Sequence, residues 1–70
     1  IPVDIRVNAG VLTWSKSYDT WLWAICKDGN VIDFTDHPTY TAKQAGIYSV
    51  RAANPMGGLS APSTTVTVTL

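Results

Sequence analysis

The chain has 70 residues, with five basic and five acidic side chains and a formal net charge of zero. A charged fraction of only 14% leaves neither a basic surface for nucleic acid nor an acidic tail. No run of about 18 apolar residues exists for a membrane span, and residues 1–3 show no sign of a signal peptide. We therefore expect neither a nucleic-acid partner nor a membrane span.

Size and aromatic content favour one small domain covering residues 1–70. A chain this short buries only about 60% of the surface that its unfolded form exposes, so large side chains are needed inside. Three Trp, three Tyr and one Phe are available for that core. The missing initiator Met indicates a fragment of a longer protein.

The first two predicted strands, at residues 3–8 and 11–14, each have one apolar face. Apolar and polar residues alternate in the first, as is typical of a half-buried strand, and in the second Leu12 and Trp14 point the same way. Ala9-Gly10 lies between them and predicts a turn. The expected inward positions are Val3, Ile5, Val7, Leu12 and Trp14.

The third predicted strand, residues 20–27, is apolar on both faces. Such a strand is central in its sheet or covered on both sides. One face consists of Trp21, Trp23 and Ile25, and the other of Leu22, Ala24 and Cys26. The following Lys27-Asp28-Gly29-Asn30 predicts a tight hairpin to a fourth strand at residues 31–35, because Asp-Gly accepts positive φ.

Three further strands complete the prediction. Residues 39–42 form a short extended piece with Tyr40 as inward anchor, and a strand beginning near Gly46 has Tyr48 on its inner face. The last strand is residues 64–70, preceded by Pro62, which would bend or bulge an edge strand. Seven short strands without helical periodicity predict an all-β fold, an antiparallel β-sandwich with a small open barrel as the alternative.

The residues resemble a fibronectin type III module over nearly the whole chain. Leu12-Thr13-Trp14 is similar to its B strand, and residues 48–54 with Gly58-Leu59-Ser60 and Ser63 are similar to its F strand, FG turn and G strand. The resemblance implies a seven-stranded immunoglobulin-like sandwich in which Trp14 packs against the opposite sheet. It also implies that the Tyr48 hydroxyl bonds back to the chain at the E to F corner. Residues 54–58 differ from the integrin-binding tripeptide of some members, so adhesion of that type is unsupported.

A second resemblance concerns Lys27-Asp28-Gly29, Phe34-Thr35, Thr39-Tyr40-Thr41 and residues 49–54. These are similar to short C-terminal modules that follow β-helical, pectate-lyase-like polysaccharide-degrading enzymes in bacteria. This resemblance implies a C-terminal accessory module of a secreted or cell-surface protein, extracellular or periplasmic. Its partner would be the adjoining catalytic domain of the same chain. The alternatives are a carbohydrate-binding module, with polysaccharide as partner, and an adhesin-type spacer.

Two surfaces are candidate binding sites. If Trp21 and Trp23 point inward, then Leu22, Ala24 and Cys26 form an outward apolar row suited to interdomain docking. Val31 and Ala53 would extend that row, unless Lys27, Arg51 and threonine stems cover it. Sugar contact would instead need exposed rings, for which Tyr18, Trp21 and Trp23 are candidates, although a core role for the two tryptophans is favoured.

The sequence offers little for catalysis. An enzyme needs converging nucleophiles, acids or metal ligands. Asp33, Asp36 and His37 are close in sequence, but the turn at His37-Pro38 favours a structural role over metal binding. Cys26 is expected to be a small apolar residue of its strand. We expect no catalytic residue, cofactor or metal in this chain.

Overall fold

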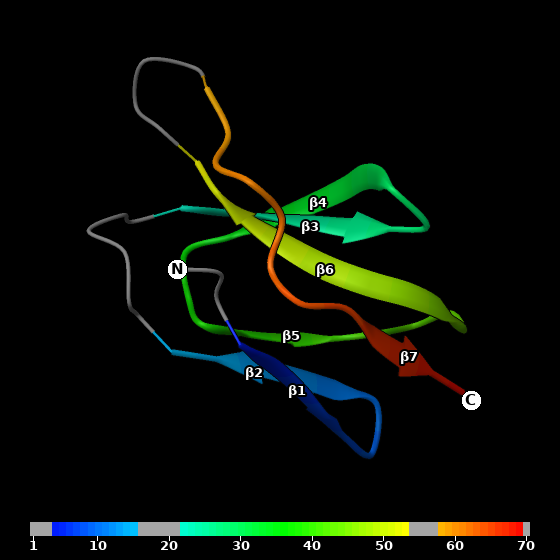
Figure 1. Cartoon of the computed structure of the whole chain (residues 1–70). Helices are drawn as coiled ribbons and strands as arrows, with labels where there is room; N and C mark the ends of the chain where they lie inside the picture. Colours follow the sequence, from blue (N-terminus) through cyan, green and yellow to red (C-terminus); the bar gives the residue numbers. More distant parts are fainter. Residues whose placement is uncertain (1–3, 16–21, 54–57, 70) are drawn as a thin grey trace.

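The computed structural model describes residues 4–15, 22–53 and 58–69. Within these residues, seven antiparallel strands form two sheets (Figure 1). One sheet has the order β1 (Ile5–Asn8), β2 (Val11–Trp14) and β5 (Thr39–Thr41). The other has the order β4 (Asn30–Thr35), β3 (Trp23–Lys27), β6 (Gly46–Ala52) and β7 (Val66–Val68). The predicted all-β architecture of seven antiparallel strands is confirmed.

The core lies between the two sheets. Trp14 of β2 and Trp23 of β3 meet edge to face, with ring centroids 5.7 Å apart and planes inclined at 70°. Aromatic pairs of this geometry contribute stability beyond the area that they bury. The other members of the core cluster are Ile5, Leu12, Ile25, Ala42, Tyr48, Val50, Ala52 and Val68, with Tyr40 and Val66 packed against it.

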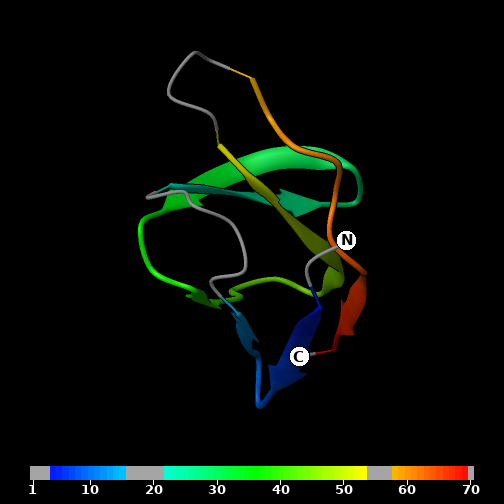
Figure 2. The same ribbon diagram turned by 60° about the vertical axis from the view of Figure 1, so that its left-hand side comes forward.

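Of the predicted inward positions in the first two strands, Ile5, Leu12 and Trp14 are buried and Val3 lies outside the described residues. Two details differ. Val7 is 36% exposed, because it lies near the end of the edge strand β1, which runs beside β7 of the other sheet (Figure 2). Trp14 is buried as expected, but its indole Nε1 has no hydrogen-bond partner among the described residues. A buried indole N–H usually has a hydrogen-bond partner, so Trp14 departs from that rule within the described residues.

Two-residue turns connect β1 to β2 and β3 to β4. Ala9 and Gly10 have φ of 52° and 78°, and Asp28 and Gly29 have φ of 53° and 85°. Two successive positive φ values match the right-handed twist of the strands that such turns join. The predicted Asp-Gly hairpin is confirmed.

Tyr48 anchors the start of β6 through its hydroxyl. Its ring is 1% exposed, and its hydroxyl donates a 2.8 Å hydrogen bond to the Gln44 carbonyl, four residues upstream. The bond ties the turn between β5 and β6 to the core. The expected bond back to the chain at this corner is confirmed.

Two serine hydroxyls accept hydrogen bonds from the backbone of β6 where the neighbouring segment, residues 60–65, is not a strand. The amides of Val50 and Ala52 donate to Ser63 Oγ and Ser60 Oγ at 2.8 and 2.9 Å. The amides of the same two serines donate to the carbonyls of Val50 and Ala52. Residues 60–65 contain Pro62 and form no regular strand. The last strand is accordingly shorter than predicted.

Asp28 fastens the β3–β4 turn to the beginning of β6. Its amide donates to the Ile47 carbonyl at 2.7 Å, and its Oδ1 accepts the Ile47 amide at 3.0 Å. Lys27 Nζ lies 3.3 Å from Asp28 Oδ2. The Ile47 amide, with Lys27, lowers the pKa of Asp28 below its ordinary value of 3.8.

We expect Tyr48→Phe to lower the free energy of unfolding by about 1 kcal/mol, because it removes one hydrogen bond and keeps the ring. Urea denaturation measures this change. Gln44→Ala is the matched control, since the acceptor is the backbone carbonyl, and its effect should stay within about 0.5 kcal/mol. An unchanged stability in Tyr48→Phe would contradict a stabilising role for this bond.

We expect Asp28→Asn to be less stable than the parent chain at neutral pH, because Asn keeps positive φ but loses the charge. A folded pKa below 3.8 means that the charged carboxylate stabilises the fold above that pH. The stabilisation disappears as the pH falls through the folded pKa. Denaturation at neutral and acidic pH should therefore show the two proteins converging in acid, whereas the exposed control Asp4→Asn should show a smaller difference at neutral pH.

Candidate docking surface

The outer face of the four-stranded sheet is defined by the residues that alternate with the core positions. The strand register places side chains from three neighbouring strands on this face. They are Ala24 and Cys26 of β3, Val31 and Phe34 of β4, and Ile47, Ser49 and Arg51 of β6.

The exposed apolar side chains of the outer face surround a covered floor. Phe34 is 52% exposed, Ile47 51% and Val31 43%. Ala24 and Cys26 are 0% and 2% exposed. A partner would therefore meet the larger side chains and not the floor.

The expectation that Leu22, Ala24 and Cys26 present an outward apolar row needs correction. Ala24 and Cys26 do belong to the outer face, but their small side chains are buried between larger neighbours on β4 and β6. Ala24 lies opposite both Phe34 and Arg51 in the register. Leu22 is half-buried, and its carbonyl accepts the Ala53 amide at 2.9 Å.

Of the two cations expected to cover this row, one lies on it. Arg51 is half-buried on the outer face, with Nη1 3.4 Å from the Ser60 carbonyl oxygen. The register places Lys27 opposite Tyr48, on the inner side, and its Nζ lies close to Asp28. The expectation that Lys27 covers the apolar row is therefore wrong.

A register shift between β3 and β4 decides which residues of β4 reach the outer face. Cys26 pairs with Val31, but Ile25 pairs with Asp33, so Ile32 is an extra residue at a β-bulge. Beyond the bulge, Phe34 lies opposite Ala24 on the outer face. Asp33 lies opposite the core residue Ile25, on the inner side.

Asp33 of β4 lies close to Tyr40 of β5, which belongs to the other sheet. Asp33 Oδ1 accepts the Phe34 amide at 2.8 Å, and its carboxylate lies near enough to the Tyr40 hydroxyl of β5 to influence the pKa of that group. Partial burial and then the Asp33 charge raise the pKa of Tyr40 above its ordinary value of 10.0. Asp33 is thus a structural acceptor in this arrangement.

The three candidate sugar-contact residues do not form an exposed platform in the described structure. Trp23 is 1% exposed and packs in the core, so its ring has no face for a sugar to stack on. Tyr18 and Trp21 lie outside the described residues. The exposed aromatic ring within the described ranges is that of Phe34.

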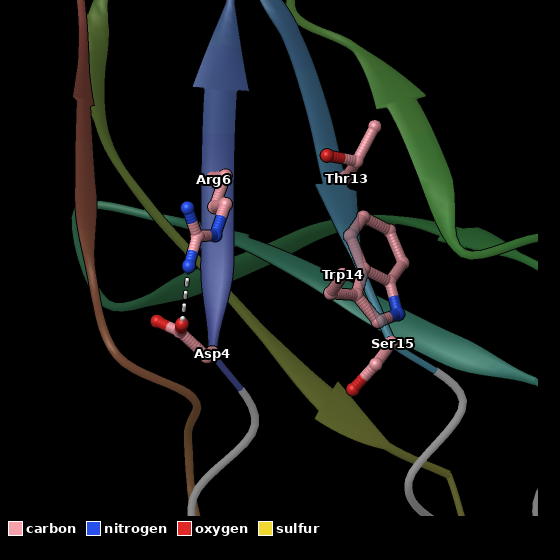
Figure 3. A pocket seen from close by; sticks show the side chains of 5 residues that line it. All are labelled: Asp4, Arg6, Thr13, Trp14 and Ser15. Carbon is pink, nitrogen blue, oxygen red and sulfur yellow. Dashed lines mark hydrogen bonds and ion pairs between the residues drawn. The ribbon is translucent and has the colours of Figure 1, made fainter.

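An open depression of about 410 Å³ lies at the end of the three-stranded sheet (Figure 3). It is lined by Asp4, Arg6, Thr13, Trp14 and Ser15. Arg6 Nη2 lies 3.4 Å from Asp4 Oδ2, and both side chains are largely exposed. Exposed pairs of this kind contribute little stability, and two neutralising charges attract neither anions nor cations strongly.

The acidic residues near the β4–β5 connection do not converge. His37 Nε2 lies 3.2 Å from Asp36 Oδ1 at the surface, whereas Asp33 lies near Tyr40 and accepts the Phe34 amide. In the part of the chain that the structure describes, no three His, Cys, Asp or Glu residues are grouped to hold a metal ion. The same part contains no helix able to cross a membrane.

Sequence reasoning missed two of the outer-face residues. Ile47 could have been identified, because it immediately precedes the inward Tyr48 in an alternating strand. Phe34 carried no such signal, since its orientation depends on the bulge. Comparison with known proteins found no matching family model, no matching curated protein and no matching solved structure.

We expect the Cys26 thiol to react slowly with a soluble thiol reagent in the native protein and rapidly in denaturant. Cys26 is the single cysteine of the chain and is buried beneath the outer face, so reaction requires local opening. The absorbance of the released chromophore measures the rate. A native rate equal to the denatured rate would show that the floor is accessible.

Proposed function

We propose that this chain is a non-catalytic, fibronectin type III-like accessory module that docks onto an adjoining domain of the same protein. The contact surface is the outer face of the four-stranded sheet. The observation that carries the proposal is the group of exposed Phe34, Ile47 and Val31 around the covered Ala24 and Cys26.

Strand order and the Tyr48 corner support the family assignment. In constant-type immunoglobulin domains, the strand after C joins the sheet of strands A, B and E. Here β4 follows β3 and pairs with it, as strand C′ would beside strand C. The Tyr48 bond to Gln44 is the type of corner found in immunoglobulin-like sandwiches.

The chemistry of the outer face favours a protein surface over a polysaccharide. Sugar-binding sites combine exposed, roughly coplanar aromatic rings with nearby polar groups. Among the residues that the structure describes, Phe34 has the one exposed ring, and its exposed neighbours on this face, Val31 and Ile47, are aliphatic. Clusters of exposed aliphatic and aromatic side chains are typical of contacts between proteins.

The resemblance of residues 27–29, 34–35, 39–41 and 49–54 to modules of pectate-lyase-like enzymes suggests the adjoining domain. We propose a secreted bacterial polysaccharide-degrading enzyme as the parent protein. Catalysis would belong to its β-helical domain, and this module would space or brace that domain. The proposal therefore predicts that altering the outer face of the module disrupts its association with the catalytic domain. It does not require that lyase activity is lost.

We expect a cysteine placed at position 34 to be accessible in the isolated module and protected in the parent protein. The probe is Phe34→Cys in a Cys26→Ala background, so that one thiol reports on the outer face. Docking should slow its labelling by about tenfold or more, because reaction then requires domain separation. Thiol labelling followed by mass spectrometry gives both rates.

The matched control is Thr13→Cys in the same background. Thr13 is exposed on the three-stranded sheet, away from the outer face, and should label equally fast in both proteins. Equal rates for the position-34 thiol would refute docking by this face. If the isolated module instead binds pectic polysaccharide and Phe34→Lys abolishes binding, the carbohydrate-binding alternative replaces docking.

A further inference from the structure

The outer edge of β4 is an unusual place for apolar side chains. β4 is the terminal strand of its sheet, and within the described ranges no strand pairs with its free edge. Val31, Ile32 and Phe34 are all between 43% and 52% exposed. An exposed apolar edge strand is a template for pairing with another chain.

We propose that Asp33 prevents an added strand from pairing with this edge. The strand that it excludes is β4 of a second copy of the same chain. This inference concerns the edge and is independent of docking through the outer face. Three observations on β4 carry it: an occupied amide, a bulge and a charge at the centre of the strand.

The first observation is the hydrogen bond from the Phe34 amide to Asp33 Oδ1, at 2.8 Å. A backbone amide has one proton, so an amide that donates to its neighbouring carboxylate is not free for an added strand. The same carboxylate lies near the Tyr40 hydroxyl of β5. Just beyond the strand, the His37 amide is similarly occupied by Thr35 Oγ1, at 3.2 Å.

The second observation is the bulge at Ile32, which interrupts the regular spacing of backbone donors and acceptors along the strand. Bulges and inward-pointing charges are two devices by which sheet edges avoid pairing. β4 has a bulge at Ile32 and a charge at the next residue, Asp33. The bulge places Asp33 opposite Ile25, on the inner side of the sheet, where the residue remains exposed.

The third observation is the charge of Asp33 at the centre of β4, and it explains why the excluded strand belongs to a second copy. The chain has zero net charge, so long-range repulsion between copies is weak. Asp33 lies near the middle of the six-residue strand, so a two-fold antiparallel pairing of two β4 strands brings two Asp33 carboxylates close together. Like charges at such a position oppose pairing.

The test compares the association state of Asp33→Ala with that of the unchanged chain by light scattering after gel filtration. We expect the unchanged chain to be monomeric and Asp33→Ala to form dimers or larger species as concentration rises. Asp36→Ala is the matched control, because it removes an exposed carboxylate outside β4 and should leave the monomer unchanged. Asp33→Ala combined with Ile32→Lys should return to monomer, since a lysine on the edge strand restores a charge there.

A folded, monomeric Asp33→Ala would overturn the proposal. So would association that Ile32→Lys does not reverse, because the contact would then lie elsewhere. If Asp33→Ala does not fold, hydrogen exchange of the unchanged chain tests the proposal instead. The Phe34 amide should be protected from exchange. Exchange at the rate of a free amide would overturn the proposal. Position 34 lies on β4, so the labelling test of the outer face is carried out at concentrations at which the protein is monomeric.

Discussion

The pairing of β3 with β4 shifts by one residue between Ile25 and Cys26. Side chains alternate across a strand, so a one-residue shift moves every later side chain to the opposite face. The shift places Phe34 on the outer face and turns Asp33 toward the inner side, where Tyr40 meets it. Without the bulge, the tight turn pairing Lys27 with Asn30 would put Asp33 opposite Ala24 and Phe34 opposite Trp23. The position of Phe34 on the outer face and that of Asp33 on the inner side both follow from this one irregularity.

Side-chain acceptors replace backbone partners at several places where the strands of this small domain end or bend. Ser60 and Ser63 accept amides of β6, Asp28 accepts the amide at its beginning, and Asp33 accepts an amide of β4. A buried or edge amide left without an acceptor is costly, and a 70-residue chain has few strands to supply acceptors. Short polar side chains therefore complete hydrogen bonding that longer strands would provide. The aromatic contact between Trp14 and Trp23 then holds the two sheets together.

Local patterns in the sequence were enough to predict the strands, the Asp-Gly turn, and the burial of Leu12, Trp14 and Tyr48. Alternation and turn chemistry are properties of neighbouring residues, so they can be identified without knowing the fold. The docking row was predicted on the correct face but with the wrong exposure, because the burial of Ala24 and Cys26 depends on side chains from adjacent strands. The face on which Phe34 lies could not be predicted, since no local sequence pattern indicates the bulge at Ile32. That Trp14 Nε1 has no hydrogen-bond partner among the described residues likewise depends on surroundings distant in sequence.

The contrast between the β4 edge and the outer face constrains how any protein can bind this domain. Strand addition recognises backbone amides and carbonyls, and therefore accepts many sequences. At the β4 edge, the Phe34 amide is occupied and a carboxylate lies beside it. On the outer face, Phe34, Ile47 and Val31 present shape and apolar area with Arg51 beside them. A partner must therefore match side chains on the face, and a domain held in the same chain meets that requirement at high effective concentration even if its intrinsic affinity is low.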